Sequence, residues 1–459
     1  MNFLNMVQAA PEVSDRGKRK SAAEVLRTLR ENALAIYRAE DFSRDVIERK
    51  FLWRKTYFVN HPDAVKHILL DNASNYQKAE LGRRLLEPGL GRGMLTSEGE
   101  IWRRHRKIMS PYFDHNSIVT YFPVIADVSN DIVESWRSLP DGAEVDIAAT
   151  MMHASLQIIC RAMFSSDSDA MVDMVDRGIA LYQNTVRPGL SDMLGFPAWF
   201  SNLFKQNVPD VFVEFDEAIA RLISARTAIG SGSHSDLLGR LVAAIDGENG
   251  ATLSAKEVRD EVVTTLVAGH ETTAQALTWT WYLLSQNPNA EAQLTNELDT
   301  VLGARPLRFE DLSNLPWTRM IIEEAMRLYP PLHAIPRQPI ADDVVMGKQI
   351  RRGSTVLVVP WLLHRNPTIW SEPEVFNPMR FSPQQSGERS RFSYIPFGTG
   401  PRVCLGARLA LTETMVILAT LARQYRLHLK PDHVVEAQGL LTTRPKNGMV
   451  MIMARRKAP

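Results

Sequence analysis

Cysteine is scarce in this sequence. Only Cys160 and Cys404 occur among its 459 residues, and they lie far apart. A small secreted protein held together by disulfides carries an even set of closely spaced cysteines, so this class is excluded and a reducing compartment fits better. We therefore expect a cytoplasmic protein in which either thiol is available for metal binding or catalysis.

Long apolar runs are missing as well. The longest, residues 356–363 and 415–422, fall well short of the roughly 18 to 20 apolar residues that span a bilayer. At the N-terminus the apolar residues precede the basic cluster, which is the reverse of the order in a secretory signal. The sequence predicts neither an integral membrane anchor nor export.

An excess of charge of one sign is also lacking. Lys and Arg together number 53 against 52 for Asp and Glu, which gives a formal net charge of +1. Without a strong positive field, nucleic acid is not an expected partner. Any partner attracted by charge has to meet a local patch.

Composition and periodicity predict a globular, mainly helical protein. The hydrophobic share of 45% and the charged share of 23% are typical of soluble domains, and no repeat or Gly/Ser linker divides the chain. We expect a polar lead-in over residues 1–25 and a single domain over residues 26–459, of the mainly α (α+β) class with small β-sheets. The individual elements expected are helices over 22–40 and most of 100–330, a strand over 51–59, and a tight hairpin turn at Asn447-Gly448.

The clearest predicted helix begins at Ser254. Its hydroxyl can cap the backbone while Glu257 reaches back, and the helix should end at Asn287, before Pro288. That is about 32 residues, or roughly 48 Å at 1.5 Å per residue. A helix of this length has to cross the whole domain.

The most informative segment surrounds Cys404. Gly398, Gly400 and Gly406 allow the backbone to approach a flat ligand closely, and a helix over 405–423 would begin next to the thiol. Free N–H groups at a helix N-terminus stabilise a thiolate. A lone cysteine is usually a small buried hydrophobic residue, and the Gly-x-Gly pair also hints at a dinucleotide loop, but Pro401 interrupts that loop and Val403 takes the place of its third glycine.

A second informative segment lies in the middle of the long helix. One face of it is small and partly polar and carries, at steps of three and four, Thr265, Ala268, Gly269, Thr272 and Ala276. A glycine inside a helix costs roughly 0.5 to 1 kcal/mol relative to alanine, so Gly269 suggests close approach by a ligand or a local opening of the helix. The hydroxyl of Thr272, backed by the carboxylate of Glu271, is suited to relaying protons. Taken singly, Thr272 would more often bond its own helix and Glu271 would more often be a surface charge, and His270 is left unassigned.

Five residues around Cys404 carry a family resemblance. Phe397, Gly400, Arg402, Cys404 and Gly406 match the Phe-x-x-Gly-x-Arg-x-Cys-x-Gly pattern of the cytochrome P450 family, which this sequence resembles from about residue 30 to 455. The resemblance implies haem b held between the long helix and the cysteine loop, with the Cys404 thiolate as axial ligand that favours cleavage of the O–O bond. It also implies that Thr272 and Glu271 are the alcohol and acid pair that delivers protons to bound oxygen.

The resemblance assigns roles to residues outside these two segments. Glu324 and Arg327 match the Glu-x-x-Arg element, and with Arg380 they are expected to form a buried structural network. The residues expected to contact haem are Trp102, Arg106, Arg337, Phe397, Arg402 and Gly406. Of these, Trp102, Arg106, Arg337 and Arg402 are expected at the haem propionates.

The implied reaction inserts one oxygen atom of O2 into a lipophilic small molecule by hydroxylation or epoxidation. Electrons from NAD(P)H are expected to arrive through separate partners, a ferredoxin with its reductase or a flavodoxin-type donor, because the chain ends soon after the last predicted strand. Basic residues of the segment 102–107 are a candidate docking patch for an acidic donor. We expect a bacterial-type monomer.

Two other functions remain open. One is a peroxide-driven hydroxylase or isomerase of the same fold, against which the Glu271-Thr272 pair argues, and the other is a haem-based gas sensor without turnover. The substrate pocket is expected to include segments 80–95 and 184–205 together with Thr265, Ala268, Gly269, Ala276, Leu332, His333, Ala334, Ile335, Leu440 and Leu441. Arg83, Arg84 and Arg187 were not assigned a place in it, and fatty acids, terpenoids and steroids all fit a pocket of this composition.

Overall fold

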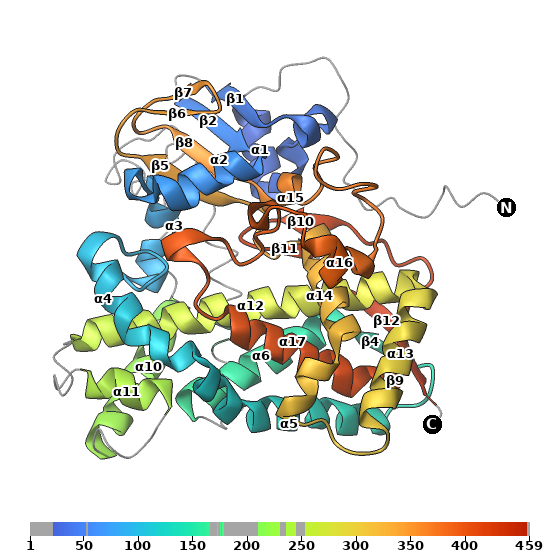
Figure 1. Cartoon of the computed structure of the whole chain (residues 1–459). Coiled ribbons are helices and arrows are strands. Elements are labelled where there is room, and N and C mark those ends of the chain that lie inside the picture. Colours follow the sequence, from blue (N-terminus) through green and yellow to red (C-terminus); the bar gives the residue numbers. More distant parts are fainter. Residues whose placement is uncertain are drawn as a thin grey trace.

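The computed structural model consists of a large helical part and a smaller part built around a β-sheet (Figure 1). It describes residues 22–51, 54–165, 172, 175, 177–178, 210–229, 236–244 and 253–456. The mainly α class with small sheets, expected from the sequence, is confirmed. The predicted pocket segment 184–205, including Arg187, lies outside the described residues, as do most residues of the lead-in.

The described helices are α1 (Ala22–Glu31), α2 (Pro62–Lys66), α3 (Glu80–Leu90), α4 (Gly99–Met109), α5 (His115–Arg137), α6 (Ile147–Phe164), α10 (Asp210–Ile229), α11 (Leu237–Ala243), α12 (Ala255–Gln286), α13 (Pro288–Leu302), α14 (Pro316–Leu328), α15 (Pro360–Leu363), α16 (Pro383–Ser386) and α17 (Ala407–Ala422). The described strands are β1 (Val46–Phe51), β2 (Arg54–Val59), β3 (Tyr76–Lys78), β4 (Glu144–Asp146), β5 (Ile335–Pro339), β6 (Asp343–Val345), β7 (Lys348–Ile350), β8 (Thr355–Val358), β9 (Tyr425–Leu429), β10 (Ala437–Gly439), β11 (Thr443–Pro445) and β12 (Val450–Arg455).

Helix α12 crosses the helical part from end to end (Figure 1). Its predicted cap is confirmed: the Ser254 hydroxyl accepts the Glu257 N–H at 3.3 Å, and the Glu257 carboxylate accepts the Ser254 N–H at 2.8 Å. Most of its side chains are buried, because α6, α14 and α17 all pack against it. The predicted end at Asn287 is also confirmed.

Helix α6 packs along α12 and is strongly apolar. Within the described part of the chain, it is the one helix with the length and composition to cross a membrane. Of that 18-residue window, 67% is buried inside the protein. The burial is what a central core helix requires, since its side chains contact both α12 and α5.

The main sheet has five strands in the order β1-β2-β8-β5-β3, in which only β2 and β8 run parallel. The single strand predicted over 51–59 is instead the second half of an antiparallel pair, β1 and β2. The N-terminal helix is shorter than predicted, since α1 ends at Glu31. There the Asn32 side chain accepts the Leu34 N–H and starts a separate 3-10 turn.

The predicted hairpin at Asn447-Gly448 is wrong. Gly448 does have a positive φ of 70°, but β11 pairs with β10, whereas β12 pairs with β4 and β9. The chain therefore leaves one sheet and enters another at this turn. A Cβ atom at Gly448 would lie 2.7 Å from Asp146 Oδ2, so the glycine permits close packing on the residue that caps α6.

Candidate active site

Helix α12 is mostly buried, but part of one face at its centre is accessible to solvent. Ala268 is exposed and Thr265, Gly269 and Thr272 are partly exposed, whereas Ala276 is buried. Four of the five small residues predicted on one face are therefore at least partly accessible.

Gly269 also lies against a neighbouring helix. A Cβ atom there would lie 2.3 Å from the Cδ1 atom of Ile159 on α6. The glycine therefore allows α12 and α6 to pack closely at this point. The sequence pattern of α12 alone did not reveal this packing contact, and the expected approach by a ligand stays a prediction.

Thr272 and Glu271 are adjacent in sequence but have different surroundings. The Thr272 hydroxyl donates to the Ala268 carbonyl at 2.9 Å on the accessible face. Glu271 is 3% exposed, and its Oε1 atom accepts a hydrogen bond of 2.6 Å from the Thr442 hydroxyl. Burial raises the pKa of the Glu271 carboxyl, while Thr442 and Arg444 oppose the rise. Glu271 is thus a buried acid and not a surface charge.

The cysteine loop, residues 397–406, is a tight turn that presents Cys404. Gly398 and Gly400 have φ of 68° and 73°, which a side chain disfavours. The Cys404 N–H donates to the Phe397 carbonyl at 2.8 Å, and α17 begins three residues later, at Ala407. The thiol is exposed at the loop surface, so a planar ligand can reach it.

Surrounding protein atoms and a hydrogen bond act in opposite directions on the Cys404 thiol. Although one side of Cys404 is open, the protein atoms packed around the rest of it exclude water and raise the pKa of its thiol, while the Gly406 N–H and the charge of Arg106 lower it. The guanidinium of Arg106 also donates to the Val403 carbonyl at 2.7 Å. A coordinated metal ion would add the positive charge that ionises such a thiol.

Three basic side chains, Lys78, Arg337 and Arg402, interact electrostatically between the main sheet and the cysteine loop, and Arg106 reaches the same loop at Val403. Lys78 and Arg337 stand directly opposite each other on β3 and β5, a placement of like charges that destabilises a sheet. Burial lowers the pKa of Lys78 to about 7 and that of Arg337 to about 10.

Glu98 is the carboxylate within this cationic cluster. Its carboxylate accepts hydrogen bonds from both terminal nitrogens of the Arg402 guanidinium and from the backbone N–H of Lys78. The same guanidinium lies 4.9 Å from the centre of the Trp102 ring. Arg337 and Arg402 together carry more positive charge than Glu98 carries negative charge, so the cluster suits a ligand with further negative charge, such as the two propionates of haem. Lys78 belongs to no motif of the sequence, so its place in this cluster becomes evident only from its pairing with Arg337 in the sheet.

The geometry can now be compared with known proteins. The family model described as Cytochrome P450 matches residues 31–452. The chain belongs to the cytochrome P450 family. It is 33% identical over 389 residues to cyclooctatin synthase of Streptomyces melanosporofaciens, with 84% of each chain covered. It is likewise 33% identical over 401 residues to cyclooctat-9-en-7-ol 5-monooxygenase of the same organism, with 84% of this chain and 83% of that protein covered.

A solved structure has the same fold. The haem domain of cytochrome P450DA superposes with a TM-score of 0.78 at 24% identity, over 96% of this chain and 93% of that one. Together with the relatives, this makes the protein a haem-thiolate P450 monooxygenase. Cys404 is the residue that would hold the iron, and the cationic cluster is where the propionates would lie.

Behind the cysteine loop of this P450 lies a fully buried ionic network. Arg327 donates two hydrogen bonds to Glu324, at 2.7 and 2.8 Å, and both side chains are 0% exposed. Arg380 lies 3.4 Å from the same carboxylate, and the Asn377 N–H donates to it at 2.9 Å. The three residues assigned to this network from the sequence are thus brought together, as partners that fix α14 against the segment before the loop.

The predicted pocket residues from two distant segments also meet. Leu332 and Leu441 are each 38% exposed, whereas His333 between Leu332 and Ala334 is buried. The His333 Nε2–H donates to the Leu440 carbonyl at 3.2 Å, which joins the two segments. His333 therefore supports the pocket wall, and its neighbours present apolar surface.

Ile335 connects that wall to the cysteine loop, since a Cβ atom at Gly398 would lie 3.8 Å from its Cδ1 atom. In the segment 80–95, Arg84 pairs with Glu80, one turn earlier on α3. This pairing makes Arg84 a poor candidate for anchoring a substrate carboxylate.

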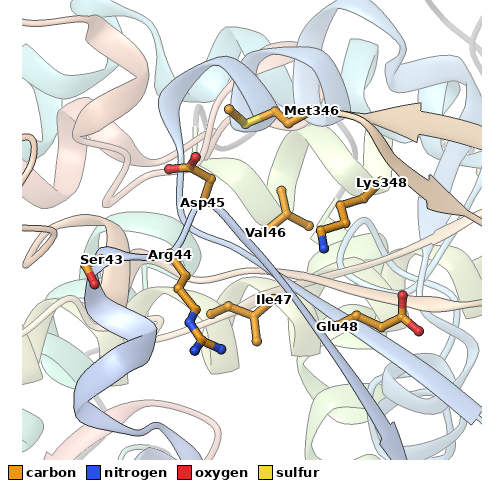
Figure 2. Close-up of a pocket in the computed structure, with 8 residues that line it drawn as sticks. All are labelled: Ser43, Arg44, Asp45, Val46, Ile47, Glu48, Met346 and Lys348. Carbon is orange, nitrogen blue, oxygen red and sulfur yellow. The ribbon is translucent and has the colours of Figure 1, made fainter.

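A separate hollow of about 540 Å³ lies at the edge of the main sheet. Figure 2 shows side chains of β1 and of the Met346–Lys348 turn around it. Its lining mixes Arg44, Asp45 and Glu48 with apolar groups and includes no residue of the cysteine loop or of the α12 centre. We therefore do not assign it to the active site.

Proposed function

We propose that this P450 inserts one oxygen atom of O2 into a lipophilic small molecule, by hydroxylation or epoxidation. The observation that carries the proposal is the accessible Thr272 hydroxyl at the centre of α12, beside the buried acid Glu271. Bound haem supplies the activation of oxygen, and the chain supplies the sulfur ligand of Cys404 and the protons. The Thr272 hydroxyl is the group that donates protons on the side where oxygen binds, and the Glu271 carboxyl group is the acid that supplies protons to Thr272.

The substrate side is apolar. Leu332, Leu441 and Ala268 offer accessible hydrocarbon surface, so the free energy of binding comes mainly from burial of apolar area. The relative whose name ends in 7-ol 5-monooxygenase acts, by that name, on an alcohol with a hydrocarbon skeleton. A terpenoid-like hydrocarbon is accordingly the first substrate class to test.

Electrons are proposed to come from NAD(P)H through a ferredoxin and its reductase, or through a flavodoxin-type donor. On α4 the side chains of Arg103, Arg104 and Lys107 are exposed on the outer face. Arg103 pairs with Glu100 and Arg104 with Glu257, so the patch attracts an acidic donor less strongly than the sequence suggested. The proposed setting is a cytoplasmic monomer.

The absorption spectrum of the reduced protein with carbon monoxide is the first test. A strongly red-shifted Soret band reports thiolate opposite carbon monoxide, and it should disappear in Cys404→Ser. Cys160→Ala, which removes a buried thiol on α6, is the matched control and should keep the band. A band of histidine type in the parent would refute the monooxygenase assignment of Cys404.

Turnover is the second test. Substrate-dependent consumption of NAD(P)H with added donor proteins is expected, together with one oxygen atom from O2 in the product. A haem-based sensor would show neither, and a peroxide-driven enzyme would form product without NAD(P)H. Either outcome would replace the proposed function.

A further inference from the structure

The acid Glu271 is held by a residue far away in the sequence. Its Oε1 atom accepts the Thr442 hydroxyl at 2.6 Å, and the two side chains are 3% and 2% exposed. A hydroxyl donating to a carboxylate in a buried place forms a short, strong hydrogen bond. The acid of α12 and the hairpin of β10 and β11 are thus joined directly.

The turn that carries Thr442 is fixed on two sides. Within the turn, the Leu440 N–H donates to the Thr442 carbonyl at 3.0 Å. Next to it, the Thr443 N–H donates to Pro331 at 2.9 Å, and the Trp279 indole N–H of α12 donates to the Thr443 carbonyl at 3.0 Å. Because a β-branched side chain is also stiff about χ1, the Thr442 hydroxyl is held at one place relative to α12.

Burial has the largest effect on the pKa of Glu271 and raises it. The Thr442 hydrogen bond and then the positive charge of Arg444 on β11 both lower it. His270, the neighbour on α12, is turned to the Leu266 carbonyl of its own helix. Removing the Thr442 hydroxyl therefore takes away the larger of the two influences that favour the carboxylate.

We propose that Thr442 is a positioning residue for Glu271 and holds its carboxyl group between α12 and the β10–β11 hairpin. The inference rests on the proposed function, in which Glu271 is the acid behind Thr272. The same turn carries Leu440 and Leu441, so the residues proposed to line the substrate pocket and the hydrogen-bond partner of Glu271 belong to one short segment. The acid is thereby kept in one orientation through the cycle of proton uptake and release.

The test uses the haem-loaded enzyme with its electron donors. Thr442→Val removes the hydroxyl and keeps the shape, whereas Thr442→Ser keeps the hydroxyl. Thr443→Val is the matched control, because Thr443 is 0% exposed and its hydroxyl has no hydrogen-bond partner among the described residues. Two quantities are measured: the pKa of the Glu271 carboxyl by infrared difference spectroscopy, with Glu271→Gln identifying its band, and kcat, KM and product per NAD(P)H against pH.

In Thr442→Val the pKa of Glu271 should rise by about one unit, the loss expected for a hydrogen bond to a charged group. Product per NAD(P)H should fall on the order of tenfold with KM unchanged, Thr442→Ser should restore both, and Thr443→Val should match the parent. If Thr442→Val and Thr443→Val behave alike while Glu271→Gln loses coupling, the positioning role is refuted and the role of Glu271 stands. If Glu271→Gln is fully coupled, the acid role in the proposed function fails and this inference fails with it.

Discussion

Glycine can be required in the cysteine loop for two reasons, a positive φ or a close contact with another backbone. Alanine substitutions at its two glycines of positive φ distinguish these reasons. Gly398 and Gly400 both have positive φ, 68° and 73°. A Cβ atom at Gly398 would meet only Ile335 Cδ1, at 3.8 Å, whereas one at Gly400 would lie 1.8 Å from the Leu69 carbonyl oxygen. Alanine at either position carries the same conformational cost, and only Gly400→Ala forces two backbones apart.

The expected magnitudes follow from this difference. The left-handed conformation costs alanine about 1 to 2 kcal/mol, partly offset by about 0.4 to 1 kcal/mol from the stiffer unfolded chain. Gly398→Ala should therefore lower the free energy of unfolding by about 1 kcal/mol. Gly400→Ala should cost about 1 to 3 kcal/mol more, the usual range when a core has to shift its backbone.

Chemical denaturation of the two variants, with haem content read from the reduced carbon monoxide spectrum, measures both effects. Because Leu69 and its neighbours contact the turn that precedes Cys404, Gly400→Ala should also lower haem content. Equal loss of stability and haem in both variants would show that φ alone sets the requirement for glycine, and the reasoning from close approach would be refuted.

Three further outcomes are expected. Thr272→Ala should keep haem, because the hydroxyl contacts only its own helix, while product per NAD(P)H falls roughly tenfold or more and hydrogen peroxide appears; unchanged coupling would remove Thr272 from proton delivery. Glu324→Ala leaves the Arg327 charge buried and unpaired, so we expect a loss of about 3 to 5 kcal/mol and of soluble holoprotein, and normal yield would show the network to be dispensable. Burial raises the pKa of Glu413 from 4.5 to about 8. Between these two pKa values the folded protein keeps a proton that the unfolded chain has released, so the free energy of unfolding falls as pH rises from the lower value to the higher one. Glu413→Gln should abolish this fall, which is at most roughly 1.4 kcal/mol per pH unit, and parallel denaturation curves against pH for variant and parent would contradict it.

Several features were predictable because they depend on neighbouring residues. The Ser254 and Glu257 cap and the stop at Asn287 set the limits of α12, since a helix terminus is decided by the residues beside it. The loop glycines and Cys404 fall within ten residues, so their resemblance to the family pattern could be recognised from the sequence. The acid and alcohol of α12 are adjacent in the same way.

Other features needed partners that spacing does not reveal. The hairpin at Asn447-Gly448 failed because β12 pairs with β9 and β4, and strand pairing depends on which chain segments the core brings together. Arg402 was assigned to haem from its place in the motif, but the structure also gives it Glu98 as an ion-pair partner. Gly269 proved to face Ile159 of α6.

The sequence by itself determined the helical class, the extent of α12, and the residues that identify a haem-thiolate P450. The tertiary structure alone decided that Glu271 is buried against Thr442, 171 positions away, and that Lys78 stands opposite Arg337. The physical reason is that periodicity and caps are set within a few residues, whereas burial, pKa and ion pairing depend on what packs against a side chain. Those properties exist only once distant segments have come together.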